Sequence, residues 1–249
     1  MKSISLIIPT YNDEKIIKEK IIFLLSKLRK KKFLYEVIIV DDGSTDSTYS
    51  ILKKLKLKNL KLLKNKFNFG KSYSIRKALR ITKYDYIVLI DSDLPYFNVF
   101  NEVIDKLNKN YDFVFVNRKH KHSKLINANL DLYQLVRHTL GYLVSLSIRI
   151  FLGFNLDGGD TQAGLKGFKK IKQFRKLKFI SKKFFLDLEI MFYYNKHNKN
   201  FFSIPVKYKI SNSSSIKIFS IKKNFFILIE LIKVINVLKS YFFAHSKKQ

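Results

Sequence analysis

The sequence contains no cysteine and no tryptophan, and its 249 residues include only three prolines and eight glycines. The lack of cysteine excludes a disulfide scaffold, a cysteine-ligated zinc or iron–sulfur site and a thiol nucleophile. No uninterrupted run of about eighteen apolar residues occurs, so no membrane-spanning helix is expected. Met1-Lys2 leads directly into a short apolar run without a cleavage site, so no signal peptide is expected either.

Acidic residues are scarce: 19 Asp and Glu stand against 49 Lys and Arg, which gives a net charge of +30. Such a charge favours anionic partners, namely nucleic acid, anionic lipid or phosphorylated substrates. AT-rich codon usage would also raise the lysine content, so the total alone selects no partner. Its distribution is more informative, because the only acidic residues after position 160 are Asp187, Glu189 and Glu230.

Short apolar runs alternate with helical patterns through the first half of the chain. Five runs rich in Ile, Val, Leu and Phe predict buried strands at 5–8, 36–40, 60–63, 86–90 and 113–116. Helices are predicted between them at 13–31, 48–56, 74–81 and 100–109. This alternation predicts an α/β fold with a mainly parallel central sheet and flanking helices, in which ligands bind at the carboxyl ends of the strands.

Polar residues follow three of the predicted strands where each strand ends. The first is followed by Pro9-Thr10-Tyr11-Asn12-Asp13-Glu14, the second by Asp41-Asp42 and the fourth by Asp91-Ser92-Asp93. Oxygen ligands of this kind suit Mg²⁺ or Mn²⁺. Such an ion is often bound by protein carboxylates and by the phosphates of the substrate at the same time. Asp41 and Asp42 are predicted to accept hydrogen bonds from a base or ribose, and Tyr11 to stack on a base.

These blocks resemble the nucleotide-binding half of family 2 glycosyltransferases, which have the GT-A fold, and Asn68-x-Gly70-Lys71 resembles a further segment of that family. Gly70-Lys71-Ser72 also ends like a P-loop, but residue 65 is asparagine where a P-loop needs glycine. The resemblance implies a metal held by Asp91 and Asp93. It also implies a nucleotide-sugar site formed by Pro9, Tyr11, Glu14, Asp41, Asp42, Lys71, Asp91 and Ser92.

The second half resembles the polyprenyl-phosphate sugar transferases within that family, such as dolichyl-phosphate glucosyltransferases and polyprenyl-phosphate mannose synthases. The segments that carry this resemblance are Asp160-Thr161-Gln162-Ala163-Gly164-Leu165-Lys166, 185–189, 204–206 and 215–217. Ala163 and Leu165 replace the usual Cys and Phe. Val116-Asn117-Arg118 stands where the family has Gly-Ser-Arg, and Gly141 stands where a serine is expected after Arg137.

The resemblance implies an inverting transfer of a hexose from a nucleotide-diphosphate sugar, of the UDP-glucose or GDP-mannose class, to a polyprenyl phosphate. Catalytic roles are implied for Asp93, Asp160 and Arg118. The acceptor phosphate is expected to contact Arg118, Arg137, Lys166 and Gln162. A phosphate acceptor is already anionic, so it needs positioning more than deprotonation. If a base is used, Asp160 is the better candidate, with Asp157 behind it.

Two other functions remain open on the residues. The acceptor of a family 2 enzyme could instead be a saccharide or a surface polymer. A basic nucleic-acid-binding protein is the alternative from another class, but the carboxylates at the strand ends disfavour it, and nucleic acid is not expected as a partner.

The domain organisation predicted from these segments is a GT-A domain over 1–217 and a basic amphipathic helix and tail over 218–249. The domain divides into a nucleotide-binding half at 1–118 and an acceptor half at 119–217. Glu230, Lys233, Asn236 and Ser240 recur at three- and four-residue steps and predict one polar helical face. The helix either packs on the core or binds an anionic membrane surface, and the expected location is cytoplasmic and peripheral at the membrane.

Overall fold

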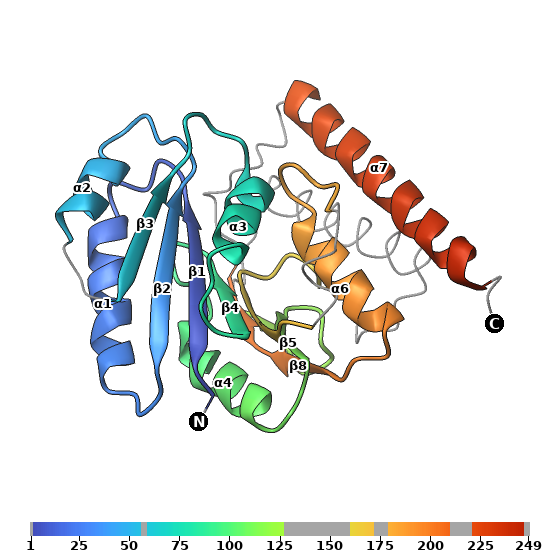
Figure 1. Cartoon of the computed structure of the whole chain (residues 1–249), viewed down its shortest axis with the longest axis horizontal. Helices are drawn as coiled ribbons and strands as arrows, with labels where there is room; N and C mark the ends of the chain where they lie inside the picture. Colours follow the sequence, from blue (N-terminus) through green and yellow to red (C-terminus); the bar gives the residue numbers. More distant parts are fainter. Residues whose placement is uncertain (1, 56–58, 127–159, 172–178, 210–220, 247–249) are drawn as a thin grey trace.

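The computed structural model describes residues 2–55, 59–126, 160–171, 179–209 and 221–246 (Figure 1). Its seven-stranded sheet has the order β3-β2-β1-β4-β7-β5-β8. The strands of this sheet are β1 Ile4–Thr10, β2 Tyr35–Asp41, β3 Leu60–Lys64, β4 Tyr86–Ile90, β5 Phe113–Asn117, β7 Leu165–Lys169 and β8 Phe201–Pro205. The short strands β6 Lys124–Leu125 and β9 Lys207–Tyr208 pair separately in parallel.

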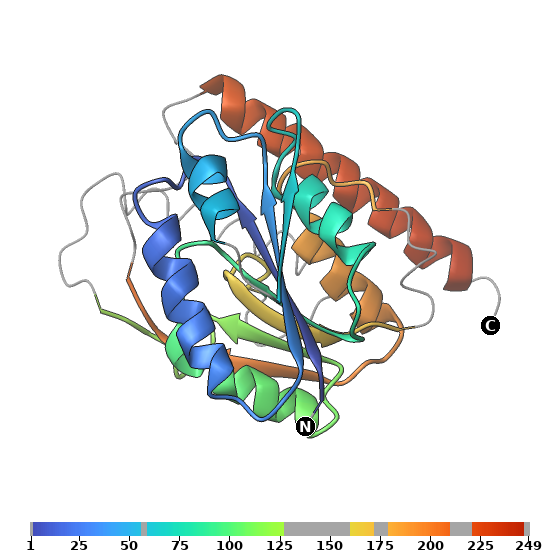
Figure 2. The same ribbon diagram turned by 60° about the vertical axis from the view of Figure 1, so that its left-hand side comes forward.

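Helices cover both faces of the sheet (Figures 1 and 2). They are α1 Ile17–Arg29, α2 Thr48–Lys54, α3 Lys71–Leu79, α4 Phe100–Asn108, α6 Leu186–Lys196 and α7 Ile221–Ser246, with a 3₁₀ turn η1 at Phe97–Val99. One hydrophobic core lies under α1, α2 and α4. The other lies under α3, α6 and α7. The predicted α/β fold with flanking helices is confirmed.

The five predicted strands are present as β1 to β5, and the four predicted helices as α1 to α4. β7 was not predicted: it runs antiparallel between β4 and β5 and interrupts the parallel order. A Cβ atom on Gly167 would lie 2.7 Å from a methyl carbon of Val103. This strand therefore needs glycine where α4 crosses it closely.

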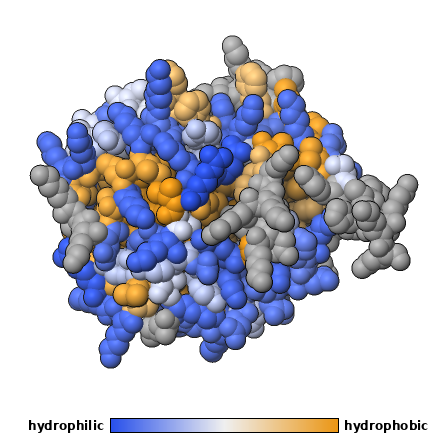
Figure 3. Space-filling model, viewed as in Figure 1, coloured by the Kyte–Doolittle hydropathy of each residue, from blue (hydrophilic) through white to orange (hydrophobic). Residues whose placement is uncertain are grey.

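The C-terminal helix α7 packs one face on the second core through Leu231, Val234, Ile235 and Leu238. Other positions of the helix expose apolar side chains, namely Phe226, Leu228 and Ile232. Figure 3 shows hydrophobic side chains gathered over α7 among hydrophilic ones. Packing on the core, one of the two predicted roles of the helix, is therefore observed.

The polar face predicted for α7 is only partly correct. Lys233, Asn236 and Ser240 are exposed, but Glu230 points toward the loop before α6, where it accepts hydrogen bonds from Ser181 and from backbone amides. Helical periodicity could not reveal this, because the partners lie 46 to 49 residues earlier in the chain.

Candidate active site

The loops after β1, β2 and β4 meet at one edge of the sheet, because these parallel strands are neighbours in the order β2-β1-β4. Asn12 links the first two loops. Its backbone N–H donates to Ser44 Oγ at 3.0 Å, and its side-chain Oδ1 accepts from the Thr45 backbone N–H at 2.9 Å. Asn12 has a φ of 54°, in the left-handed region that asparagine tolerates. The loops after β1 and β2 are therefore bonded to each other.

Asp13 joins the loop after β1 to the loop after β4. Its Oδ2 accepts hydrogen bonds from Thr10 Oγ1 and from Ser92 Oγ, both at 2.6 Å. The predicted site did not include Asp13, although it lies inside the first strand-end motif. The Ser92 hydroxyl, predicted to bind the nucleotide sugar, donates to Asp13 here and so orients the loop that carries Asp91 and Asp93.

Glu14 lies toward the start of α2 rather than toward Asp91. Its Oε2 accepts a hydrogen bond from the Ser47 N–H at 2.9 Å, and its own N–H donates to Asp46 at 3.1 Å. Hydrogen bonds from Thr48 and from the Glu14 amide lower the pKa of Asp46, although burial opposes them. In this structure the carboxylates of Glu14 and Asp46 fasten the loops after β1 and β2 to each other.

The two carboxylates of the Asp41-Asp42 pair have different surroundings. Asp42 accepts four hydrogen bonds, from Asn65, Phe69 N–H, Gly70 N–H and Ser74, at 2.7 to 3.1 Å. Asp41 is fully buried, and its Oδ1 has no hydrogen-bond partner among the residues that the structure describes. A buried oxygen without a donor is costly, so Asp41 is the member of the pair suited to a ligand N–H or O–H.

Asp91 and Asp93 follow β4 as predicted, and Lys71 lies beside them. The Lys71 ammonium is 2.5 Å from Asp91 Oδ1. Burial opposes the charge on Lys71, but the charges of Asp91 and Asp187 raise its pKa to about 12. Burial and the charge of Asp91 raise the pKa of Asp93. These two carboxylates repel each other, so a cation between them would be favourable.

Gly164 packs directly against the Asp91 carboxylate. Its carbonyl accepts the Asp91 N–H at 3.0 Å, and a Cβ atom at this position would lie 2.6 Å from Asp91 Oδ2. The loop before β7 therefore fixes Asp91 by a contact that only glycine allows. Oxygen donors held in this way fit Mg²⁺ or Mn²⁺, which prefer carboxylate and phosphate ligands.

Arg118, which follows β5, and Asp160 form a bidentate ion pair. Arg118 Nε and Nη2 donate to Asp160 at 2.7 and 2.8 Å, and the Arg118 amide donates at 3.0 Å. Asp160 is 2% exposed. Burial alone would raise the pKa of Asp160, but the charge and hydrogen bonds of Arg118 lower it to about 2. Asp160 is therefore a weak base at neutral pH.

Two of the other residues predicted for the acceptor phosphate, Lys166 and Gln162, lie among the described residues. Lys166 is buried, with its ammonium 3.4 Å from Asp187 and bonded to the Ala163 carbonyl, and burial lowers its pKa. Gln162 is exposed beside the Arg118–Asp160 pair, and its N–H donates to Asp160 at 3.3 Å. Arg137 and Asp157 lie outside the described residues.

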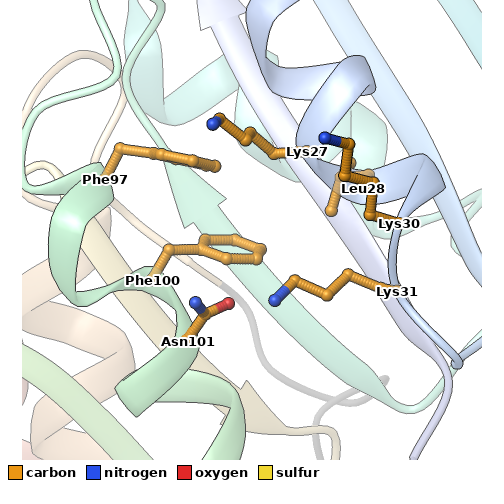
Figure 4. A pocket seen from close by; sticks show the side chains of 7 residues that line it. All are labelled: Lys27, Leu28, Lys30, Lys31, Phe97, Phe100 and Asn101. Atoms are coloured by element: carbon orange, nitrogen blue, oxygen red, sulfur yellow. The ribbon is translucent and has the colours of Figure 1, made fainter.

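A cavity of about 140 Å³ lies elsewhere, between the end of α1 and the start of α4 (Figure 4). Its lining residues are Lys27, Leu28, Lys30, Lys31, Phe97, Phe100 and Asn101. None of the predicted site residues lines it. The candidate active site is therefore the set of strand-end loops.

The fold is that of the GT-A glycosyltransferases. Its sheet is mixed because β7 runs antiparallel, and carboxylates follow β1, β2 and β4. Glucosyl-3-phosphoglycerate synthase from Mycobacterium tuberculosis, solved with Mn²⁺, UDP-glucose and phosphoglyceric acid, superposes with a TM-score of 0.66. The two chains are 16% identical, and the match covers 94% of this chain and 80% of the other. Mannosyl-3-phosphoglycerate synthase from Rubrobacter xylanophilus superposes with a TM-score of 0.61 at 14% identity, over 93% of this chain and 73% of the other.

The chain belongs to glycosyl transferase family 2, because the model of that family matches residues 5–151. It is 30% identical to dolichyl-phosphate beta-glucosyltransferase of Dictyostelium discoideum over 181 residues, which are 67% of this chain and 54% of that protein. It is 36% identical over 148 residues to the protein MJ0544 of Methanocaldococcus jannaschii, covering 55% of this chain and 62% of the other. The chain thus spans between half and two thirds of the length of these relatives. The predicted family and GT-A fold are confirmed.

Proposed function

We propose that this protein is a metal-dependent inverting glycosyltransferase that moves a hexose from a nucleotide-diphosphate sugar to a polyprenyl phosphate. The observation that carries the proposal is the set of carboxylates at neighbouring strand ends. They are the buried Asp41, whose Oδ1 has no hydrogen-bond partner among the described residues, and the pair Asp91 and Asp93, whose charges repel each other. The relatives support the same chemistry, since one is named a dolichyl-phosphate beta-glucosyltransferase.

The donor base would bind between Tyr11 and Asp41. Tyr11 is 41% exposed at the end of β1, where its ring can stack on a base. Asp41 Oδ1 would accept the ring N–H that uracil and guanine both carry, and this bond would remove the cost of its unpaired oxygen. Asp42 is saturated by protein donors, so we assign it to holding the segment before α3 rather than to contacting the nucleotide.

The donor diphosphate would lie beside Asp91, Asp93 and Lys71. A bound Mg²⁺ or Mn²⁺ would supply charge neutralisation of the leaving diphosphate. Asp91 and Asp93 are the residues that would hold it, with Gly164 and Ser92 fixing their loop. Lys71 carries a second positive charge at the same place, which favours the anionic leaving group electrostatically.

The state of Asp160 favours a phosphate acceptor over a sugar hydroxyl. A hydroxyl needs a general base poised near the working pH, whereas the pKa of Asp160 is about 2. A phosphate is an anion already and needs positioning by cations. We propose that Arg118, which is held by Asp160, and the exposed Gln162 contact this phosphate. Lys166 would add charge from behind them, and Arg137 stays a predicted contact.

Thermal unfolding with nucleotide sugars tests the donor site. We expect Mn²⁺ together with UDP-glucose, GDP-mannose or UDP-N-acetylglucosamine to raise the Tm by about 5–10 °C at a concentration about a hundredfold above Kd. The variant Asp41→Ala should lose most of this shift, because it removes the oxygen that would accept the ring N–H of the base. A wild-type Tm that no nucleotide sugar raises in the presence of Mn²⁺ would contradict the proposed function.

A polyprenyl-phosphate acceptor would lie in a membrane, and α7 has exposed apolar side chains that could bind a membrane surface. Among the helices that the structure describes, none combines the length and hydropathy needed to cross a bilayer. We propose peripheral binding to anionic lipid through the exposed apolar side chains of α7, namely Phe226, Leu228 and Ile232, beside which Lys233 is also exposed.

Flotation with vesicles that contain anionic lipid measures this binding. Replacing Phe226, Leu228 and Ile232 together by serine should reduce the floated fraction several-fold, because it removes the large apolar side chains that α7 exposes between residues 226 and 240. Deleting α7 is a poorer test, since its other side is part of the core. Asn236→Ala, an exposed change on the same helix, is the control. Equal flotation of the triple variant and wild type would refute the role of α7.

A further inference from the structure

Glu230 of α7 holds the loop at 181–184, which connects to the start of α6. Its Oε1 accepts hydrogen bonds from Ser181 Oγ at 2.7 Å, from the Lys183 N–H at 2.7 Å and from the Phe184 N–H at 3.4 Å. Glu189 of α6 holds the same loop from the other side, accepting the Ile180 and Ser181 amides. Two carboxylates from two helices therefore fix the position of this loop.

The loop in turn fixes the first residues of α3. Ser181 Oγ and Ser72 Oγ are 3.0 Å apart and share a hydrogen bond. The Ser72 N–H donates to the Lys183 carbonyl at 3.0 Å. Gly70 approaches so closely that a Cβ atom there would lie 2.7 Å from Lys183 Cα. Gly70 also has a φ of 100°, which favours glycine for a second reason.

Lys71 lies between these two anchored residues. Gly70 is held by Asp42 through its N–H at 2.7 Å and packs on Lys183, and Ser72 is bonded to the same loop. The backbone of Lys71 is thus fixed on both sides, and its ammonium reaches Asp91 at 2.5 Å. Figures 1 and 2 both show the first half of α7 beside the end of the molecule where α3 begins.

We propose that Glu230 is a positioning residue for the donor diphosphate site and acts through the loop at 181–184 on Lys71. The inference rests on the proposed function, because it takes Lys71 and Asp91 as the place of the diphosphate. It makes α7 part of the donor site although the helix lies outside the matched family region at 5–151. A carboxylate with three donors is a strong anchor, since hydrogen bonds to charged groups exceed neutral ones.

We call the series of contacts from Glu230 through the loop at 181–184 to Lys71 the relay. Calorimetric titration of the full chain with UDP in the presence of Mn²⁺, and with GDP in parallel, tests it. Glu230→Ala should weaken nucleotide binding about tenfold. Glu230→Gln should bind within about threefold of wild type, because the three donors all reach Oε1 and a glutamine amide oxygen can accept them. In a Lys71→Ala background, adding Glu230→Ala should change Kd less than about twofold.

Two controls separate positioning from loss of stability. Leu238→Ala removes a buried contact of α7 without touching the loop, so it should lower the Tm while leaving the Kd for UDP unchanged. If Glu230→Ala does not fold, Ser181→Ala breaks the same relay between α7 and Ser72 and takes its place. In either variant, amide hydrogen exchange at residues 70–72 should speed up.

The outcomes distinguish this inference from the proposed function. Wild-type protein that binds neither UDP nor GDP with Mn²⁺ overturns both. Wild-type binding that Glu230→Ala leaves unchanged overturns the relay alone. A loss that persists in full in the Lys71→Ala background also overturns it, since Glu230 would then act by another route.

Discussion

Replacing Asp93 by alanine is expected to lower kcat/KM by about a thousandfold or more while the fold remains intact. Asp93 and Asp91 lie close enough after β4 for their charges to repel each other. Both carboxylates are candidates to hold the divalent ion that would neutralise the leaving diphosphate. The fold should tolerate the change, because removing one of two repelling carboxylates relieves their repulsion. Steady-state turnover of the donor sugar, together with the Tm of the variant, measures both effects.

A matched control for this change lies at the other end of the same strand. Asp85 precedes β4, is mostly exposed, and pairs with Lys170 at 3.8 Å. Asp85→Ala should keep full turnover, since exposed ion pairs contribute little. Binding of UDP that depends on Mn²⁺ should disappear in Asp93→Ala and persist in Asp85→Ala. If Asp93→Ala keeps its turnover, the proposed metal assignment is wrong.

The strand-end part of the site was predictable because its signals are local. A buried strand followed at once by carboxylates places those groups at the sheet edge whatever the rest of the chain does, and β1, β2 and β4 follow this rule. The sequence could not show that Asp42 binds protein donors while one oxygen of Asp41 has no partner among the described residues. The donors that saturate Asp42 come from 23 to 32 residues further along the chain.

The part of the chain after β5 was harder to predict for the same reason. β7 joins β4 across more than seventy residues, and no periodicity in its five residues announces an antiparallel strand. Glu230 has the spacing of a surface position on a helix, yet it binds a loop 47 residues away. Long-range hydrogen bonds decide these placements, and helical or strand periods carry no information about them.

Replacing Asp160 by asparagine is expected to destabilise the fold by about 2 kcal/mol at neutral pH. Arg118 would lose two charge-assisted bonds, but its side chain is 34% exposed, so water compensates part of the loss. The pKa of Asp160 is lowered to about 2 from a usual value of 3.8. The stabilisation is therefore complete above about pH 4 and is lost as the pH falls toward 2. Urea unfolding at several pH values should show this loss in wild type and its absence in Asp160→Asn.

The kinetics of the same variant separate positioning from base catalysis at Asp160. If Asp160 orients Arg118 toward a phosphate acceptor, the KM for the acceptor should rise more than kcat falls, because the cation loses its direction but no proton transfer is removed. If Asp160 instead takes a proton from a hydroxyl acceptor, kcat should fall by a factor of about 100 to 10,000 with little change in KM. Arg118→Lys is the matched variant, since it keeps the charge but not the two parallel bonds. It should reproduce the rise in KM only if the phosphate is the group that Arg118 positions.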